Sequence, residues 1–120
     1  MAPSVISIFI PMAPLGKARP RVTKRGTYMP VKYSKWKAEF GTRAKLAWAP
    51  FHPITGPFSM RIIFGTLTGK MRSDLDNCWG ACADALQDAG LIANDRDCRQ
   101  LSAKIITSKI PGISVEVEAL

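Results

Sequence analysis

Apolar and polar residues recur along the chain with two different periods, which predict strands and helices in a mixed order. Short β-branched runs and strict alternation predict strands, whereas apolar residues three and four positions apart predict helices. The strands are expected at residues 4–11, 58–65, 99–107 and 113–118. The last run alternates apolar residues with Ser114, Glu116 and Glu118, so we expect a partly solvated strand at the edge of a sheet.

Two helices are expected among these strands, and polar residues mark where they begin. Ser34 is a suitable cap for a helix over residues 35–48. Either Asp74 or Asp76 would cap the second helix. That helix would end just before Gly90, because glycine commonly follows the last turn of a helix.

A short basic hairpin is expected between the first strand and the first helix. Arg21-Val-Thr and Thr27-Tyr-Met flank Lys24-Arg-Gly26, whose glycine suits a left-handed turn position. The whole order predicts an α/β (α+β) fold in a single small domain over residues 1–120. Its parts would be a mixed sheet of about four strands, two helices and the basic β-hairpin.

The charge is divided sharply along the chain. The first 73 residues contain 13 Lys and Arg but only one acid, Glu39, whereas the remaining 47 contain 4 basic residues and 8 acids. The net charge is +8 and the pI is about 9.8, which favours nucleic acid or an anionic membrane surface as partner. The division predicts a basic platform for a polyanion beside an acidic site for a metal.

Several classes of protein are disfavoured. No segment approaches the roughly 20 apolar residues of a membrane span, and the run Val5 to Ile10 is too short and lacks the basic start of a signal peptide. Because the positive charges also cluster, we favour nucleic acid over a membrane surface and expect a cytoplasmic protein that does not bind membranes. The three cysteines are more consistent with small buried residues than with disulfides or a zinc site.

The best candidate chemistry lies where the strand over 58–65 gives way to the second helix. Asp74 and Asp76 both fall at that junction, although capping requires only one aspartate. Asp95 joins them only if the chain after the helix leads back to its beginning. Gathered carboxylates would suit Mg²⁺ or Mn²⁺, which prefer hard oxygen ligands. From composition alone, a nucleic-acid-binding domain with capped helices stays equally open.

A longer set of motifs resembles a known family. The strings Asp74-Leu-Asp-Asn, Ala83-Asp-Ala-Leu, Ala89-Gly-Leu and Asn94-Asp resemble the RusA family of Holliday-junction resolvases of bacteria and their prophages. The basic segment that begins Lys17-Ala-Arg-Pro-Arg also resembles prophage members. The likeness covers about residues 5–118.

The resemblance implies a homodimeric, metal-dependent endodeoxyribonuclease that makes paired cuts in four-way DNA junctions during recombination and repair. By motif position, Asp74, Asp76 and Asp95 match the family's catalytic, metal-binding aspartates, with Mg²⁺ as the cofactor and Mn²⁺ as a substitute. Asp84 also fits the family pattern, but we expect it to be a solvated helix charge. Asp97 has no counterpart in the family.

One position departs from the family pattern. The family usually has a lysine four residues after the second aspartate, where this chain has Gly80. Lys70 or Arg72 could supply the missing positive charge. Without such a charge, the alternative is a protein that binds junctions or other nucleic acid with little or no nuclease activity. A small DNA-binding regulator whose aspartates only cap a helix is the third hypothesis.

Basic residues in three segments are the predicted DNA contacts, because lysines and arginines neutralise phosphates and release counterions. They are Lys17, Arg19, Arg21, Lys24, Arg25, Lys32, Lys35, Lys70 and Arg72.

Overall fold

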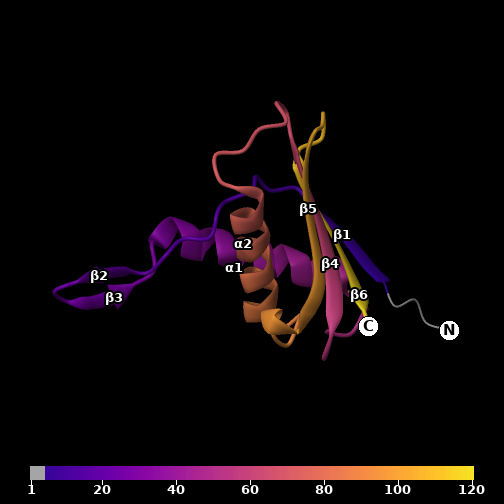
Figure 1. Ribbon diagram of the computed structural model, residues 1–120, viewed down its shortest axis with the longest axis horizontal. Coiled ribbons are helices and arrows are strands. Elements are labelled where there is room, and N and C mark those ends of the chain that lie inside the picture. Colours follow the sequence, from indigo (N-terminus) through magenta and orange to yellow (C-terminus); the bar gives the residue numbers. More distant parts are fainter. Residues whose placement is uncertain (1–4) are drawn as a thin grey trace.

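The computed structural model describes residues 5–120, which form a four-stranded sheet, two α-helices and a separate two-stranded hairpin (Figure 1). In chain order the elements are β1 (Val5–Ile10), β2 (Arg21–Thr23), β3 (Gly26–Tyr28), α1 (Val31–Trp48), β4 (Phe58–Thr66), α2 (Leu75–Asp88), the short 3₁₀ helix η1 (Asp95–Asp97), β5 (Cys98–Thr107) and β6 (Gly112–Ala119). The expected fold class is confirmed. Ser4, with which the predicted first strand begins, lies outside the described residues.

The four-stranded sheet has the order β1-β6-β4-β5. β4 and β5 run parallel, whereas β6 runs antiparallel to both β1 and β4. The last strand therefore lies in the middle of the sheet, and the prediction that it forms an edge is wrong. Alternation reports that one face of a strand meets solvent, but it carries no information about how many neighbours the strand has.

Both helices cover one face of this sheet, and the opposite face is left open (Figure 1). Along β4 the side chains of Phe58, Met60 and Ile62 are fully buried, while Arg61 between them is exposed. Glu116 of β6 is the register partner of Arg61 and is exposed as well. The hydrophobic core thus lies between the helices and the covered face, and the open face carries charged residues beside the exposed Phe9.

Helix α1 begins at Val31, four residues before its predicted start. Pro30 takes the N-cap position, and the Ser34 N–H donates to its carbonyl oxygen at 3.1 Å. The prediction that Ser34 caps the helix is therefore wrong. The earlier turn is stabilised by a tertiary contact that no local pattern contains, because it buries Tyr33 to 2% exposure against α2.

The segment β4-α2-β5 is a β-α-β unit, and this connectivity sets where the two ends of α2 lie. Because β4 and β5 are parallel, the chain has to travel back along the sheet through α2 before β5 can start. The helix accordingly begins beyond the carboxyl end of β4 and ends toward the amino end of β5 (Figure 1). Gly90, at φ 78°, follows its last turn as predicted.

The β2–β3 hairpin extends away from the rest of the molecule (Figure 1), and we call residues 19–29 the arm. All residues of both strands are exposed. Gly26 has φ 122°, which confirms the left-handed turn expected there. The protruding arm contributes to an elongated shape of 55 × 33 × 25 Å.

Within residues 5–120, no helix combines the length and apolar composition needed to cross a membrane.

Candidate active site

Two aspartates at the start of α2 have carboxylates that the fold itself hardly uses. Asp74 holds the N-cap position, yet its side chain makes no capping hydrogen bond. Asp76, in the first turn, accepts only from the N–H of its neighbour Asn77, at 2.9 Å. Both are exposed, and neither is among the ion pairs formed by residues 5–120. Helix capping therefore does not explain the pair.

The surroundings of these carboxylates favour a hard cation. The exposed N–H groups and the positive end of the helix dipole stabilise each negative charge by roughly 0.3–1 kcal/mol. Cys78 is in the same helix, and burial, with Asp74 and Asp76 nearby, raises the pKa of its thiol. The thiol therefore stays protonated, and carboxylate oxygens are the available ligands, which suits Mg²⁺ or Mn²⁺.

Asp95 lies at the other end of the same helix. Its backbone N–H donates to the side-chain oxygen of Gln87, in the last turn of α2, at 2.8 Å. A helix of 14 residues is about 21 Å long, so one chain holds Asp95 far from Asp74 and Asp76. Among the described residues, no group of three His, Cys, Asp or Glu side chains is placed to hold a metal ion. The structure brings Asp74 and Asp76 together and leaves Asp95 apart.

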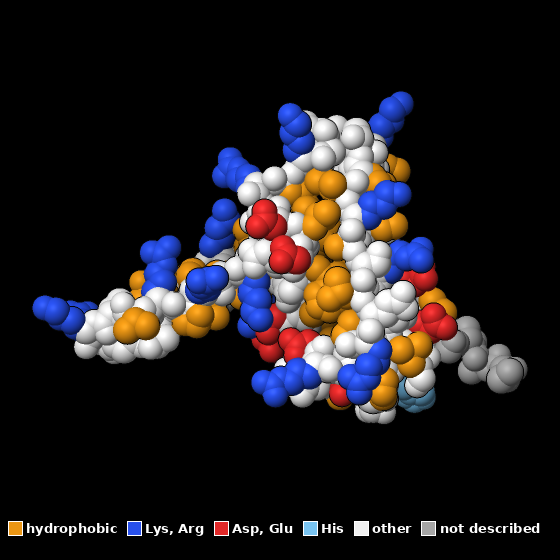
Figure 2. All heavy atoms as spheres, in the orientation of Figure 1, with side chains coloured by type: hydrophobic (Ala, Val, Ile, Leu, Met, Phe, Trp, Pro, Cys, Tyr) orange, Lys and Arg blue, Asp and Glu red, His pale blue; other side chains and the backbone are white. Residues whose placement is uncertain are grey.

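The predicted DNA contacts are all on the surface. Lys17 and Arg19 precede the hairpin, Arg21, Lys24 and Arg25 lie on it, Lys32 and Lys35 belong to α1, and Lys70 and Arg72 lie between β4 and α2. Each is exposed, and none takes part in an ion pair among residues 5–120. Figure 2 shows blue side chains along the arm and around the upper loops, with red side chains over α2 between them. Their positive charge is therefore available to phosphates.

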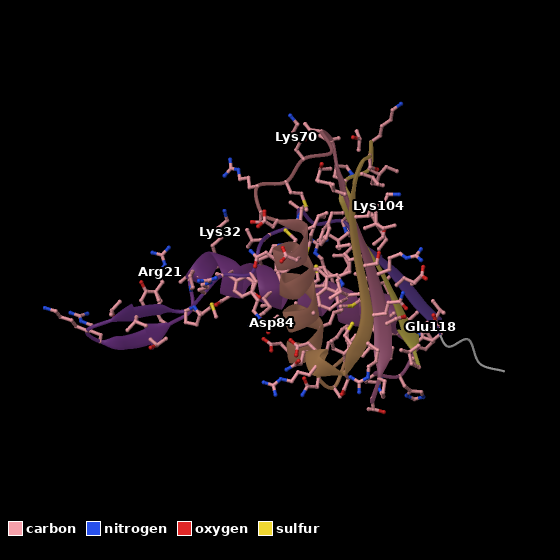
Figure 3. The ribbon with its side chains drawn as sticks, viewed as in Figure 1. Arg21, Lys32, Lys70, Asp84, Lys104 and Glu118 are labelled. Carbon is pink, nitrogen blue, oxygen red and sulfur yellow. The ribbon has the colours of Figure 1, made fainter. Side chains whose placement is uncertain are left out.

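A cleft with basic walls lies next to the start of α2, although Asp74 and Asp76 are not among its lining residues. Its volume is about 350 Å³, and its walls include Lys32, Lys70, Arg72 and Ser73, the residue before Asp74. Figure 3 shows Lys32 extending from the beginning of α1 and Lys70 from the loop above α2. The hydroxyl oxygen of Thr66 is buried at this cleft without a hydrogen-bond partner in the described part of the chain. The basic side chains of this cleft and the Thr66 hydroxyl are suited to binding an anion.

Sequence reasoning missed a polar link between the helices. Asp84 accepts from the Tyr33 hydroxyl at 2.7 Å and from Lys37 at 3.3 Å, and Lys37 also pairs with Asp88 at 2.8 Å. The Asp84 side chain is only 21% exposed, so the prediction of a solvated charge is wrong. The linked residues lie four positions apart on each helix, Tyr33 and Lys37 on α1 and Asp84 and Asp88 on α2. This spacing places each pair on one helix face, and it is the signal that could have found the link. A hollow between α1 and α2 adjoins this link, and two of its charged lining residues, Lys37 and Asp88, pair with each other.

The buried cysteines behave as predicted. Cys78 and Cys82 are buried, and Cys98 is partly buried. Burial raises the pKa of the Cys82 and Cys98 thiols, so both are held in the protonated form.

A family model described as Endodeoxyribonuclease RusA matches residues 11–118. The matched region contains the arm, the basic cleft, the aspartate pair and Asp95. A comparison with curated proteins finds no matching relative.

Proposed function

The chain belongs to the RusA family of endodeoxyribonucleases, and from this membership we propose that it nicks DNA at four-way junctions. The observation that best supports the proposal is the juxtaposition of two uncommitted carboxylates, Asp74 and Asp76, with a cleft lined by Lys32, Lys70 and Arg72. Carboxylates alone would repel a phosphodiester, and a basic cleft alone would only bind one. Together they fit hydrolysis of a phosphodiester with a divalent cation.

Asp74 and Asp76 would hold that cation, Mg²⁺ or, in its place, Mn²⁺. Both carboxylates are exposed at the start of a helix and form no ion pair among residues 5–120, which meets the preference of these ions for hard ligands. A cation held there would lower the pKa of the attacking water and neutralise charge on the phosphate.

The chain's own cations would bind and position the DNA strand. Lys32, Lys70 and Arg72 would neutralise the phosphates on both sides of the cleavage point and hold the strand beside Asp74. In the net reaction the water oxygen bonds to phosphorus while one bond from phosphorus to a sugar oxygen breaks. The departing sugar oxygen gains a proton, and the new phosphate monoester keeps the negative charge.

We also propose that the protein acts as a homodimer in which Asp95 of each copy completes the site of the other. One chain keeps its Asp95 about a helix length from Asp74 and Asp76, so a second copy is the simplest source of a third carboxylate. A two-fold axis would then create two equal sites. Two sites match the two strands that have to be cut to resolve a four-way junction.

The proposal is tested by nicking of a synthetic four-way junction with Mg²⁺, Mn²⁺ or no divalent cation. Wild type should make paired nicks that need the cation and spare a duplex of the same sequence. Asp76→Asn should lose at least about 100-fold in rate, because a neutral amide is a poor ligand for a hard cation. Glu118→Gln, an equivalent loss of charge on the open face of the sheet, should cleave like the wild type. Cleavage by Asp76→Asn at the wild-type rate would contradict the role of the pair.

A second candidate function is junction binding with little or no cleavage. It is favoured by the separation of Asp95 from the aspartate pair within one chain. Tight binding of the junction without nicks in any divalent cation would support this function. Equal binding of junction and duplex at matched salt would instead support a simple DNA-binding regulator.

A further inference from the structure

The segment between β1 and β2, which contains Gly16 and Lys17, crosses the start of α2 at very close range. The Lys17 N–H donates to the carbonyl oxygen of Asn77 at 3.3 Å. A Cβ atom on Gly16 would lie 2.6 Å from the Asn77 side-chain nitrogen and 2.7 Å from the Cβ of Ser73, so only glycine permits this approach. The contact fixes Lys17 directly beside the turn that carries Asp76.

The Lys17 side chain then runs along α2 over Gly80. A Cβ atom built on Gly80 would have one neighbour within 4 Å among the described residues outside the local helix backbone, the Cδ of Lys17 at 3.9 Å. Gly80 follows Asp76 by four residues, so the two positions lie one turn apart on the same side of the helix. The space that a side chain at position 80 would enter is therefore next to the Lys17 stem.

The Lys17 ammonium is uncommitted. Lys17 is exposed, and no carboxylate lies within ion-pair distance of it among residues 5–120. Asp76 is a neighbour along the helix surface but is not paired with it. A cation that emerges one helical turn from Asp76, and that no carboxylate among residues 5–120 neutralises, is suited to contact an anion bound at the start of α2.

We propose that Lys17 is a catalytic residue that donates a hydrogen bond from its ammonium to the phosphodiester being cleaved next to Asp74 and Asp76. This assignment rests on the proposed function. The ammonium keeps its protons throughout and stabilises the negative charge that grows on the phosphate oxygens as water adds. Lys70 and Arg72 line the cleft and serve the flanking strand.

The rate of the chemical step separates this role from simple binding. Lys17→Met keeps an aliphatic stem over Gly80 and removes the charge. Under single-turnover conditions with saturating protein, we expect Lys17→Met to nick a four-way junction about 100-fold more slowly, a typical effect of losing one charge-stabilising donor. The dissociation constant for the junction should rise by only about threefold, as for one phosphate contact among many. Lys104→Met, on the open face of the sheet, should match the wild type in both.

A relocation experiment tests the position of the charge. Lys17→Ala should be as slow as Lys17→Met, and adding Gly80→Lys to Lys17→Ala should recover most of the lost rate, because position 80 opens into the same space. Thermal unfolding of each variant, followed by circular dichroism, verifies that it is folded.

The outcomes separate the catalytic role of Lys17 from the proposed function. A wild type that nicks the junction while Lys17→Met is equally fast at saturation overturns the role of Lys17 and leaves the proposed function standing. Failure of Gly80→Lys to restore any rate to a folded Lys17→Ala variant overturns the placement of the charge beside Gly80. A wild type without nicking activity under any divalent cation overturns the proposed function and the catalytic role of Lys17 together.

Discussion

Glycines at two positions decide what can surround the aspartate pair. At Gly16 a side chain would collide with Ser73 and Asn77, whereas at Gly80 a Cβ would meet only an ordinary contact with Lys17. Glycine inside a helix costs roughly 1 kcal/mol relative to alanine, so Gly80 does not serve the stability of α2. Gly80, where the resemblance of the sequence motifs predicts a lysine, thus coincides with the point where the distant Lys17 lies on the helix.

The fold makes the Tyr33 hydroxyl a weaker acid than it is in the unfolded chain. Burial and the hydrogen bond to Asp84 raise its pKa well above the ordinary value of 10.0. Above about pH 10 the unfolded chain loses the Tyr33 proton while the folded chain keeps it, so the free energy of unfolding falls as the pH rises. The fall should reach at most about 1.4 kcal/mol per pH unit from this one group.

Replacing Tyr33 isolates that contribution. Tyr33→Phe should be less stable than the wild type by about 1 kcal/mol at neutral pH, because it loses one hydrogen bond and leaves Asp84 with fewer partners. The difference should shrink as the pH rises through 10 and above, as measured by urea unfolding at each pH. Tyr28→Phe, on the exposed hairpin, should keep the wild-type pH dependence. A difference between Tyr33→Phe and wild type that stays constant with pH would contradict the assignment.

At the scale of elements, the arm is separate from the stability of the domain. Its strands pair only with each other and their side chains are exposed, so the core does not depend on them. An element that protrudes, is strongly basic and buries little is suited to contact with phosphates. Even the apolar Val22 of β2 is 81% exposed to solvent.

Removing the arm's charges should therefore weaken DNA binding without unfolding the protein. In the triple variant Arg21→Ala, Lys24→Ala, Arg25→Ala, the slope of log affinity against log salt should become shallower by about 0.9 for each duplex phosphate that the arm no longer neutralises. Thermal unfolding should stay within about a degree of the wild type, since surface substitutions of this kind change stability little.

A charge-matched control is the triple variant Lys45→Ala, Lys104→Ala, Lys109→Ala, which removes the same net charge from exposed positions off the arm. Its salt slope should stay near that of the wild type. Equal slopes for the two triple variants would show that only total charge matters, which would contradict a specific role for the arm.

At the scale of the whole molecule, the separation of Asp95 from Asp74 and Asp76 makes a testable difference between one copy and two. If the sites are shared, a mixed dimer of Asp76→Asn and Asp95→Asn chains has one site with all three aspartates and one site with two defects. Random exchange of subunits makes about half of the dimers mixed. Mixing the two inactive variants should therefore restore nicking, one strand at a time rather than in pairs.

The matched control is a mixture of Asp74→Asn and Asp76→Asn chains, in which every shared site keeps one defect, so no activity should return. Light scattering coupled to size-exclusion chromatography measures whether dimers are present. A monomer at the concentrations where wild type nicks junctions, or no recovery from exchanged Asp76→Asn and Asp95→Asn dimers, would refute the shared site.

Local sequence patterns were sufficient to predict most of the secondary-structure elements of this molecule. Periodicity located every strand of the four-stranded sheet, both helices and the hairpin, because these elements depend on side chains a few residues apart. The helix-start aspartates and the basic segments were also visible, since charge and capping chemistry are written in neighbouring residues. The family to which the chain belongs followed from the same local motifs and is confirmed.

The sequence by itself thus determined the elements, their order, the divided charge and the residues worth testing. Only the tertiary structure decided that β6 lies inside the sheet, that α1 starts at Val31 to bury Tyr33, and that the β-α-β connection holds Asp95 a helix length from Asp74 and Asp76. It also decided that Lys17 lies over Gly80. Each of these depends on contacts between segments distant in the chain, whose free energies no local period or cap records.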